Sequence, residues 1–159
     1  MRNVFDFVWL IPVLPLAGFF ILGFMRNQLS KSAAAVIGCA TVLASFIISV
    51  LVFFSVTNGN TQVLHYFNFI QLRTLTLGFD FKIDQLSSLF LLVITGVGFL
   101  IHVYSSAYMH EEDGKDFAKY FCYLNLFVFS MLLLVMGSNF VIMFFGWEGV
   151  GLCSYLLIG

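Results

Sequence analysis

Charged residues are scarce in this sequence. Of its 159 residues, 9% are Asp, Glu, Lys or Arg and 61% are hydrophobic. Soluble domains carry about 25% charged residues, and a small domain buries only about 70% of the surface of its unfolded chain. The composition therefore excludes a soluble globular domain and predicts a membrane protein with several spans. Because the net charge is −1 and no basic run occurs, nucleic acid is excluded as a partner.

Clustered cysteines are also absent. Cys39, Cys122 and Cys153 lie far apart, each inside an apolar segment, and no CxxC pair occurs. Iron–sulfur clusters and zinc sites need grouped ligands. We therefore predict no metal site and no disulfide, and we interpret the cysteines as small packing residues.

Long apolar segments dominate the rest of the sequence. A membrane-spanning helix needs about 20 apolar residues. The segments that meet this length are residues 7–25, 33–56, 86–109, 120–136 and 140–158. The first is too long for the core of a cleaved signal peptide, so we predict a retained helix.

The connection between the second and third segments predicts a β-hairpin. Apolar residues alternate with other residues from Leu75 to Ile83, which is typical of a strand with one covered face. The aromatic-rich stretch 63–70 can pair back on it through a turn at 71–74. We predict a hairpin over about residues 63–83 that lies on one membrane surface, with an irregular loop as the alternative.

The other connections constrain direction and orientation. The short turn 137–139 makes the fourth and fifth helices antiparallel neighbours, and residues 110–119 form a polar loop. Lys and Arg favour the cytoplasmic side of short loops. The connections on one side of the membrane carry slightly more Lys and Arg residues, so this side is assigned to the cytoplasm. The N-terminus and the hairpin then lie outside. The larger group is Arg26, Lys31, Lys115 and Lys119, and the smaller is Arg2, Arg73 and Lys82.

Glu148 is the only charged residue inside the five apolar segments. A carboxyl group at mid-membrane depth costs roughly 3 kcal/mol on insertion scales. The neighbouring Gly149 and Gly151 remove side-chain bulk, which lets a helix or water approach the carboxyl. We interpret Glu148 as a proton carrier. The alternative is a neutral acid that hydrogen-bonds a neighbouring helix, but such bonds contribute only about 0.6 kcal/mol on average.

His102 is the second candidate site residue. It lies about four residues beyond the midpoint of the third segment, ~6 Å toward the side where the third and fifth helices both end. Imidazole titrates near neutral pH, so His102 is a candidate relay between Glu148 and that side. The alternative is a neutral histidine hydrogen-bonded at a helix interface. The nearby Gly146-x-x-Gly149-x-Gly151 pattern is not a dinucleotide loop, because no strand precedes it.

Three motifs together resemble a known family. They are Asp84-Gln85-Leu86-Ser87, the run from Val93 to Ser105, and Gly146-Trp147-Glu148-Gly149-Val150-Gly151-Leu152 with its continuation to Gly159. The sequence resembles subunit L of proton-pumping NADH–quinone oxidoreductase, whose mitochondrial relative is NADH dehydrogenase subunit 5. The resemblance implies an all-α polytopic membrane protein with five transmembrane helices and an extramembrane β-hairpin between helices 2 and 3. It also implies that residues 1–159 are the N-terminal portion of a larger antiporter-like bundle, truncated at the C-terminus.

The resemblance also implies roles for particular residues. Glu148 matches a glutamate assigned to a proton channel, and His102 matches a family histidine. The lysine that partners the glutamate belongs to a later helix, beyond Gly159. Relatives are expected to carry an acidic residue near Asn139, which this sequence lacks. If that acid helps water entry, this chain must manage without it.

The implied function is a proton-translocating membrane subunit of respiratory complex I. This chain is expected to hold no cofactor, since NADH, FMN, iron–sulfur clusters and quinone belong to partner subunits, and to be inactive alone. Its expected partners are other membrane subunits, lipid and protons, in the bacterial inner membrane or, alternatively, the mitochondrial inner membrane. The alternative functions are a subunit of a multi-subunit Na⁺/H⁺ antiporter without redox activity, and a membrane scaffold segment.

Overall fold

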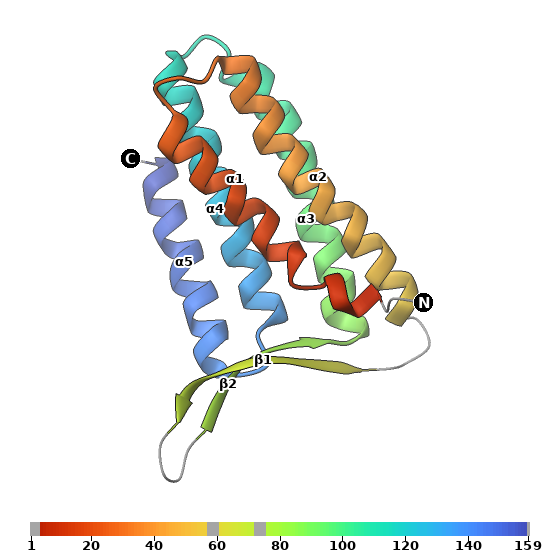
Figure 1. Cartoon of the computed structure of the whole chain (residues 1–159). Helices are drawn as coiled ribbons and strands as arrows, with labels where there is room; N and C mark the ends of the chain where they lie inside the picture. The colour runs from red at the N-terminus through yellow and green to blue at the C-terminus, as the bar shows by residue number, and fades with distance from the viewer. Residues whose placement is uncertain (1–3, 57–60, 72–75, 159) are drawn as a thin grey trace.

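The computed structural model describes residues 4–56, 61–71 and 76–158, and it confirms the helical membrane fold (Figure 1). Among the described residues, five helices are long and apolar enough to cross a membrane. The elements in chain order are the 3-10 helix η1 (Val4–Phe7), α1 (Leu10–Met25), α2 (Lys31–Val56), β1 (Gln62–Gln71), β2 (Thr76–Ile83), α3 (Gln85–Tyr108), α4 (Gly114–Met136) and α5 (Phe140–Ile158).

The helices run alternately up and down. Helices α1 to α4 pack around a shared interior, and α5 packs beside α4 at the edge (Figure 1). The fourth helix begins at Gly114, whereas the sequence placed its start at about residue 120. Polar side chains in its first turns are typical of a loop, so the sequence did not reveal this helix start, although Phe117 and Ala118 are already buried there. The polar loop is therefore shorter than the predicted 110–119.

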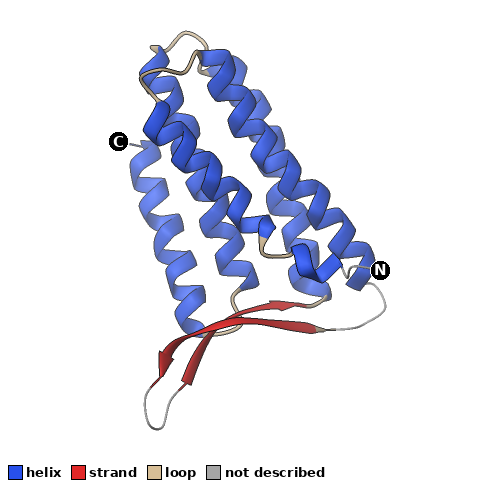
Figure 2. Cartoon of the chain, viewed as in Figure 1, coloured by secondary structure: helices blue, strands red, loops and turns tan. Residues whose placement is uncertain are grey.

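The hairpin lies across one end of the helices (Figure 2). Strands β1 and β2 pair antiparallel, and the rings of Phe67 and Phe79 stack across them with centroids 5.1 Å apart. Phe81 and Ile83 are buried against the helix ends, as the alternating pattern predicted. Residues 72–74 of the predicted turn lie outside the described residues.

Buried apolar residues gather at both ends of the bundle. The cluster at the hairpin end comprises Val8, Ile11, Val42, Val52, Val56, Phe81, Ile83, Leu91, Val128, Leu132 and Met136. The cluster at the opposite end comprises Leu22, Ala34, Phe117, Ala118, Phe121 and Cys122. Between these clusters, the buried residues include Gly18 of α1, Gly38 of α2 and Asn125 of α4.

A serine of α2 satisfies a backbone group that a proline leaves free in α1. Pro15 lies inside α1 and has no N–H to donate to the carbonyl of Ile11, one turn earlier. The hydroxyl of Ser45 donates to that carbonyl instead, at 2.8 Å. Unsatisfied backbone groups are costly in a membrane, so this bond allows Pro15 within a spanning helix.

Helix α3 begins with a capping box. The side chain of Asp84 accepts a hydrogen bond from the backbone N–H of Ser87, and the hydroxyl of Ser87 accepts one from the N–H of Asp84, both at 2.8 Å. The bond from the Ser87 backbone lowers the pKa of the Asp84 carboxyl below its ordinary value, and the nearby Lys82 ammonium lowers it further. The hairpin thus leads directly into a fixed helix start.

Replacing Asp84 with Ala should destabilise the start of α3 by about 1 kcal/mol, because one cap is lost. The carboxylate contributes its stabilisation above the pKa of an unfolded-state Asp, and this contribution is lost as the pH falls through the lower folded-state pKa. Hydrogen exchange at the Ser87 and Ser88 amides measures both effects. Exchange that is equally fast in Asp84→Ala and the parent chain would refute the assigned cap.

Candidate functional site

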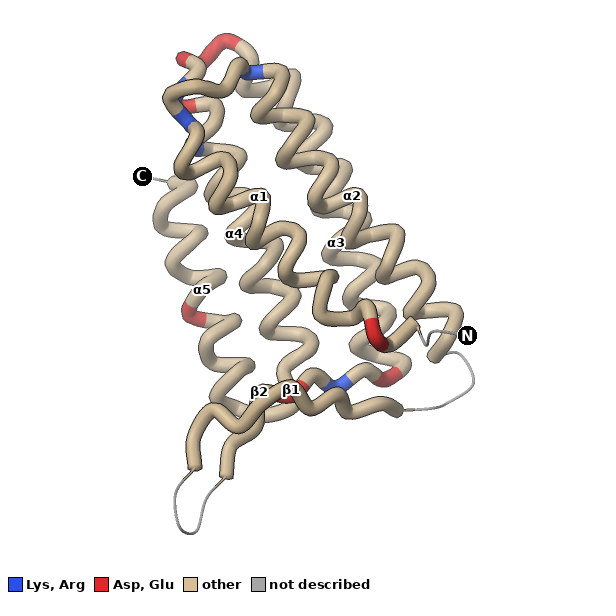
Figure 3. The backbone as a smooth tube through the Cα atoms, viewed as in Figure 1, with Lys and Arg blue, Asp and Glu red and all other residues tan. Residues whose placement is uncertain are grey.

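Glu148 lies on the outer face of α5. It is the ninth residue of a 19-residue helix, so it lies about 12 Å along the axis from Phe140. The other charged residues gather toward the two ends of the bundle (Figure 3). The side chain of Glu148 is exposed, and it forms no hydrogen bond or ion pair with any described residue. The glutamate therefore points away from this five-helix segment.

Apolar side chains surround Glu148 on that face. Phe144, Trp147, Leu152 and Tyr155 are all more than half exposed. An exposed apolar helix face is ordinary where lipid or another membrane segment covers it, but a carboxylate facing lipid alone is not. In a membrane, the face that carries Glu148 therefore needs a polar or cationic neighbour.

The glycines near Glu148 fall on different faces of α5. A Cβ atom on Gly146 would lie 2.5 Å from the backbone nitrogen of Leu134, and one on Gly149 would lie 2.5 Å from the hydroxyl of Ser130. A Cβ on Gly151 would meet nothing within 4 Å. Gly149 thus lets α5 approach α4 closely. Both Gly149 and Gly151 were expected to free space beside Glu148, and of these two only Gly151 faces unoccupied space.

Asn139 joins α5 to the hairpin. Its side-chain oxygen accepts hydrogen bonds from the backbone N–H groups of Val141 and Ile142, both at 3.1 Å, which caps the helix. Its amide nitrogen donates to the carbonyl of Gly78 in β2 at 2.8 Å. An aspartate could accept the same caps but could not donate to Gly78. This position thus carries an amide that bonds to α5 on one side and to β2 on the other.

Replacing Asn139 with Asp should separate these two roles. The carboxylate keeps the cap, and its charge is favourable at a helix N-terminus, but the bond to β2 is lost. Replacing Asn139 with Ala should lose both, at about 1 kcal/mol for the cap. Hydrogen exchange at the Ile142 amide should rise only in the Ala variant, whereas hairpin amides should exchange faster in both. Equal exchange at Ile142 in the two variants would contradict the assignment.

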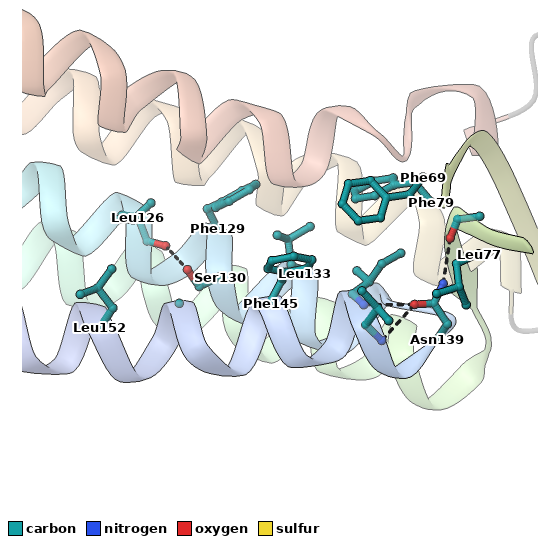
Figure 4. A pocket seen from close by; sticks show the side chains of 14 residues that line it. Phe69, Leu77, Phe79, Leu126, Phe129, Ser130, Leu133, Asn139, Phe145 and Leu152 are labelled. Carbon is teal, nitrogen blue, oxygen red and sulfur yellow. Dashed lines mark hydrogen bonds between the residues drawn. The ribbon is translucent and has the colours of Figure 1, made fainter. Parts of the chain in front are cut away.

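A cavity of about 380 Å³ lies between α4, α5 and the hairpin. Figure 4 shows Phe129, Leu133 and Phe145 around it, with Asn139 at the hairpin end. The hydroxyl of Ser130, on its wall, donates to the carbonyl of Leu126 at 2.9 Å. Gly149 lines the cavity and Glu148 does not. The cavity is apolar and lies on the side of α5 that faces α4, so it is not a chamber around the carboxyl.

His102 is fully buried among α2, α3 and α4. Its Nδ1 atom lies 2.7 Å from the carbonyl oxygen of Gly98, and its ring meets Phe121 edge-on with centroids 5.9 Å apart. The Nε2 atom is buried and has no hydrogen-bond partner among the described residues. Asn125 of α4 and Thr41 of α2, joined by a 2.9 Å hydrogen bond, lie in the same interior.

The structure does not bring His102 and Glu148 together. The histidine is enclosed by the four-helix interior, whereas the glutamate faces outward from the edge helix. A relay between them stays a prediction. Asn125 was not predicted as a site residue, although a polar residue within an apolar helix indicates a functional position, as it did for Glu148. The two sets of hydrogen bonds made by Asn139 were not predicted either.

Comparisons with known proteins relate most of the chain to one family. Residues 69–121 match the family model described as "NADH-Ubiquinone oxidoreductase (complex I), chain 5 N-terminus". The chain is 42% identical over 149 residues to NADH-quinone oxidoreductase subunit L of Escherichia coli K12, and 44% identical over 157 residues to that of Mycobacterium tuberculosis H37Rv. The alignments cover 92% and 96% of the chain, respectively.

The chain is similar over almost its whole length to members of the subunit L family. It spans 24% of the length of each of these two relatives. A solved structure supports the fold independently: a chain in the Mrp complex from Dietzia sp. DQ12-45-1b matches with a TM-score of 0.65 and 22% sequence identity. That match covers 93% of this chain and 16% of the other. The arrangement of five helices and a hairpin thus recurs within longer chains, in the subunit L family by sequence and in the Mrp complex by fold.

Proposed function

We propose that this chain forms part of a proton-translocating membrane subunit of NADH–quinone oxidoreductase, in which Glu148 carries the proton. The observation that carries the proposal is the placement of one carboxyl midway along α5, on an exposed face, with no partner among the described residues. The similarity to NADH-quinone oxidoreductase subunit L supports the link to a redox-driven complex.

The position of Glu148 suits a group that changes its protonation state. A carboxyl group in an apolar membrane environment is favoured as the neutral acid, and a nearby cation or water shifts the balance toward the carboxylate. Glu148 has no fixed partner in the described part of the chain, so its charge depends on the membrane segment that covers α5. A lysine on that segment, moving closer or farther, would make Glu148 release or take up a proton.

The apolar surroundings add to this effect. Phe144, Trp147 and Leu152 lie near Glu148 on the same side of α5 and keep the local dielectric low. A change in a neighbouring charge therefore acts strongly on the carboxyl. Coupling is reciprocal: an event elsewhere that favours protonation of Glu148 is itself favoured when Glu148 is protonated.

The redox chemistry lies outside this chain in our proposal. NADH, FMN, iron–sulfur clusters and quinone bind partner subunits, and this chain holds none of them. Other membrane subunits of complex I cover its exposed apolar faces, and the chain on its own is inactive. The proposed location is the inner membrane of a bacterium.

The test uses inverted membrane vesicles from cells that contain or lack the gene for this chain. With the gene, NADH addition should acidify the vesicle interior, as read by quenching of a ΔpH-sensitive dye. Without it, the acidification should fall. The competing antiporter function predicts the opposite pattern: NADH-driven acidification is unchanged, and a Na⁺ pulse dissipates ΔpH only when the gene is present. That second pattern would refute the proposal.

A further inference from the structure

A buried polar cluster separates the two apolar clusters of the four-helix interior. It is centred on the buried His102 of α3 and Asn125 of α4 and the half-buried Thr41 of α2, with Gly18 and Gly38 beside them. His102 and Asn125 are each 0% exposed. Buried polar groups in a membrane protein are costly unless their hydrogen bonds are satisfied. Each donor and acceptor in the cluster therefore needs a hydrogen-bond partner.

The bond to Gly98 fixes the tautomer of a neutral His102. A carbonyl oxygen only accepts hydrogen bonds, so the proton of this bond lies on Nδ1. The other ring nitrogen, Nε2, then carries a lone pair and acts as an acceptor. It is the buried side-chain atom without a hydrogen-bond partner in the described part of the chain. His102 thus needs a donor at Nε2.

The assigned hydrogen-bond donors of Thr41 and Asn125 bond to acceptors other than His102. The hydroxyl of Thr41 has one hydrogen, directed to the carbonyl of Gly38 or to the side-chain oxygen of Asn125. The amide nitrogen of Asn125 has two, and one goes to the carbonyl of Phe121 at 3.0 Å. The second N–H of Asn125 has no assigned acceptor. A lone pair and an N–H thus both lack partners in one small region.

Gly38 lies beside both groups and against the ring of Phe121, whose Cδ1 atom would lie 2.7 Å from a Cβ atom on Gly38. A Cβ atom at Gly38 would lie 3.2 Å from Nδ2 of Asn125 and 3.6 Å from Cδ2 of His102, the ring carbon bonded to Nε2. The absence of a side chain lets the imidazole and the amide approach the same part of α2. One molecule that both accepts and donates satisfies both groups, and water does this with 2 to 4 polar partners.

We propose that His102, Asn125 and Thr41 form a buried water-binding site between α2, α3 and α4, in which a water donates to Nε2 of His102 and accepts from Nδ2 of Asn125. The site is distinct from Glu148 and does not depend on the proposed function. It gives His102 a partner with which to exchange protons inside the four-helix interior, where Thr41 completes the cluster through Asn125.

Solid-state NMR of the whole chain in lipid bilayers, with ¹⁵N-labelled histidines, tests this site. The signals of His102 are those lost in His102→Gln, which separates them from the exposed His65 and His110. We expect a protonated Nδ1, a bare Nε2, and transfer of magnetisation from water protons to Nε2. A direct contact between Nε2 and the Asn125 amide, or no transfer from water, would overturn the proposal.

Variants of the water partners sharpen the test. Asn125→Leu, of similar size but without the amide, should abolish the water transfer to Nε2. Thr41→Val, which keeps the shape of the side chain, should weaken it by freeing the Asn125 amide to reorient, and it serves if Asn125→Leu misfolds. Ser55→Ala is the matched control, because Ser55 makes a similar helix bond on the exposed part of α2. A loss in the control as large as in Asn125→Leu would contradict the assignment.

Discussion

Replacing Glu148 with Gln should abolish most NADH-driven proton pumping in the assembled complex, while assembly itself should survive. Gln keeps the size of the side chain and can hydrogen-bond, but it cannot release a proton. Glu148 is exposed and makes no hydrogen bond or ion pair with a described residue, so the fold of this segment should not change. Pumping is measured as NADH-driven acidification of inverted vesicles, and assembly is measured on native gels.

The matched control is Glu112→Gln, which removes one carboxylate from the exposed polar loop at the end of the bundle. It should leave both pumping and assembly at the level of the parent protein. Normal pumping by an assembled Glu148→Gln complex would refute the role of Glu148 as proton carrier. Loss of the complex on native gels would instead support the scaffold function.

Replacing Gly146 with Ala should force α5 away from α4. The added Cβ would lie 2.5 Å from the backbone nitrogen of Leu134 and 2.7 Å from its Cα. Backbone atoms cannot move aside as the end of a side chain can, so the helices must shift apart. Overpacking of this kind costs about 1 to 3 kcal/mol. The loss is measured as the free energy of unfolding of the chain in mixed micelles with increasing denaturing detergent.

Gly151→Ala is the control for this experiment. It makes the same chemical change in the same helix, but its Cβ meets nothing within 4 Å. Ala favours a helix over Gly by up to about 1 kcal/mol, so this variant should be as stable as the parent chain or slightly more so. Equal stability changes in the two variants would show that the close approach of α4 and α5 has been misassigned.

The fold could largely be predicted from sequence because its determinants are local. Apolar length defines the spanning helices, and short connections make neighbours antiparallel. The alternation ending in Ile83 identified the covered strand face, which Phe81 and Ile83 confirm. The start of α4 was missed because Lys115 and Asp116 are solvated in a first helical turn as readily as in a loop, so composition alone does not locate the boundary.

The site was less accessible to sequence, because it depends on which way each helix face points. The spacing of Gly149 and Gly151 could not show that one packs on Ser130 while the other faces open space. The depth of His102 along its helix could be estimated, but not its enclosure beside Asn125. The two-sided bonding of Asn139 depends on the hairpin lying beneath α5, which no local pattern specifies.

Infrared difference spectroscopy tests the central claim most directly, that Glu148 changes its protonation state during turnover. The assembled complex is studied with and without NADH, in the carbonyl-stretch region of protonated carboxyl groups. We predict a band that shifts when glutamate is ¹³C-labelled, disappears in Glu148→Gln and persists in Glu112→Gln. A spectrum that is identical in the Glu148→Gln variant and the parent complex would contradict the account.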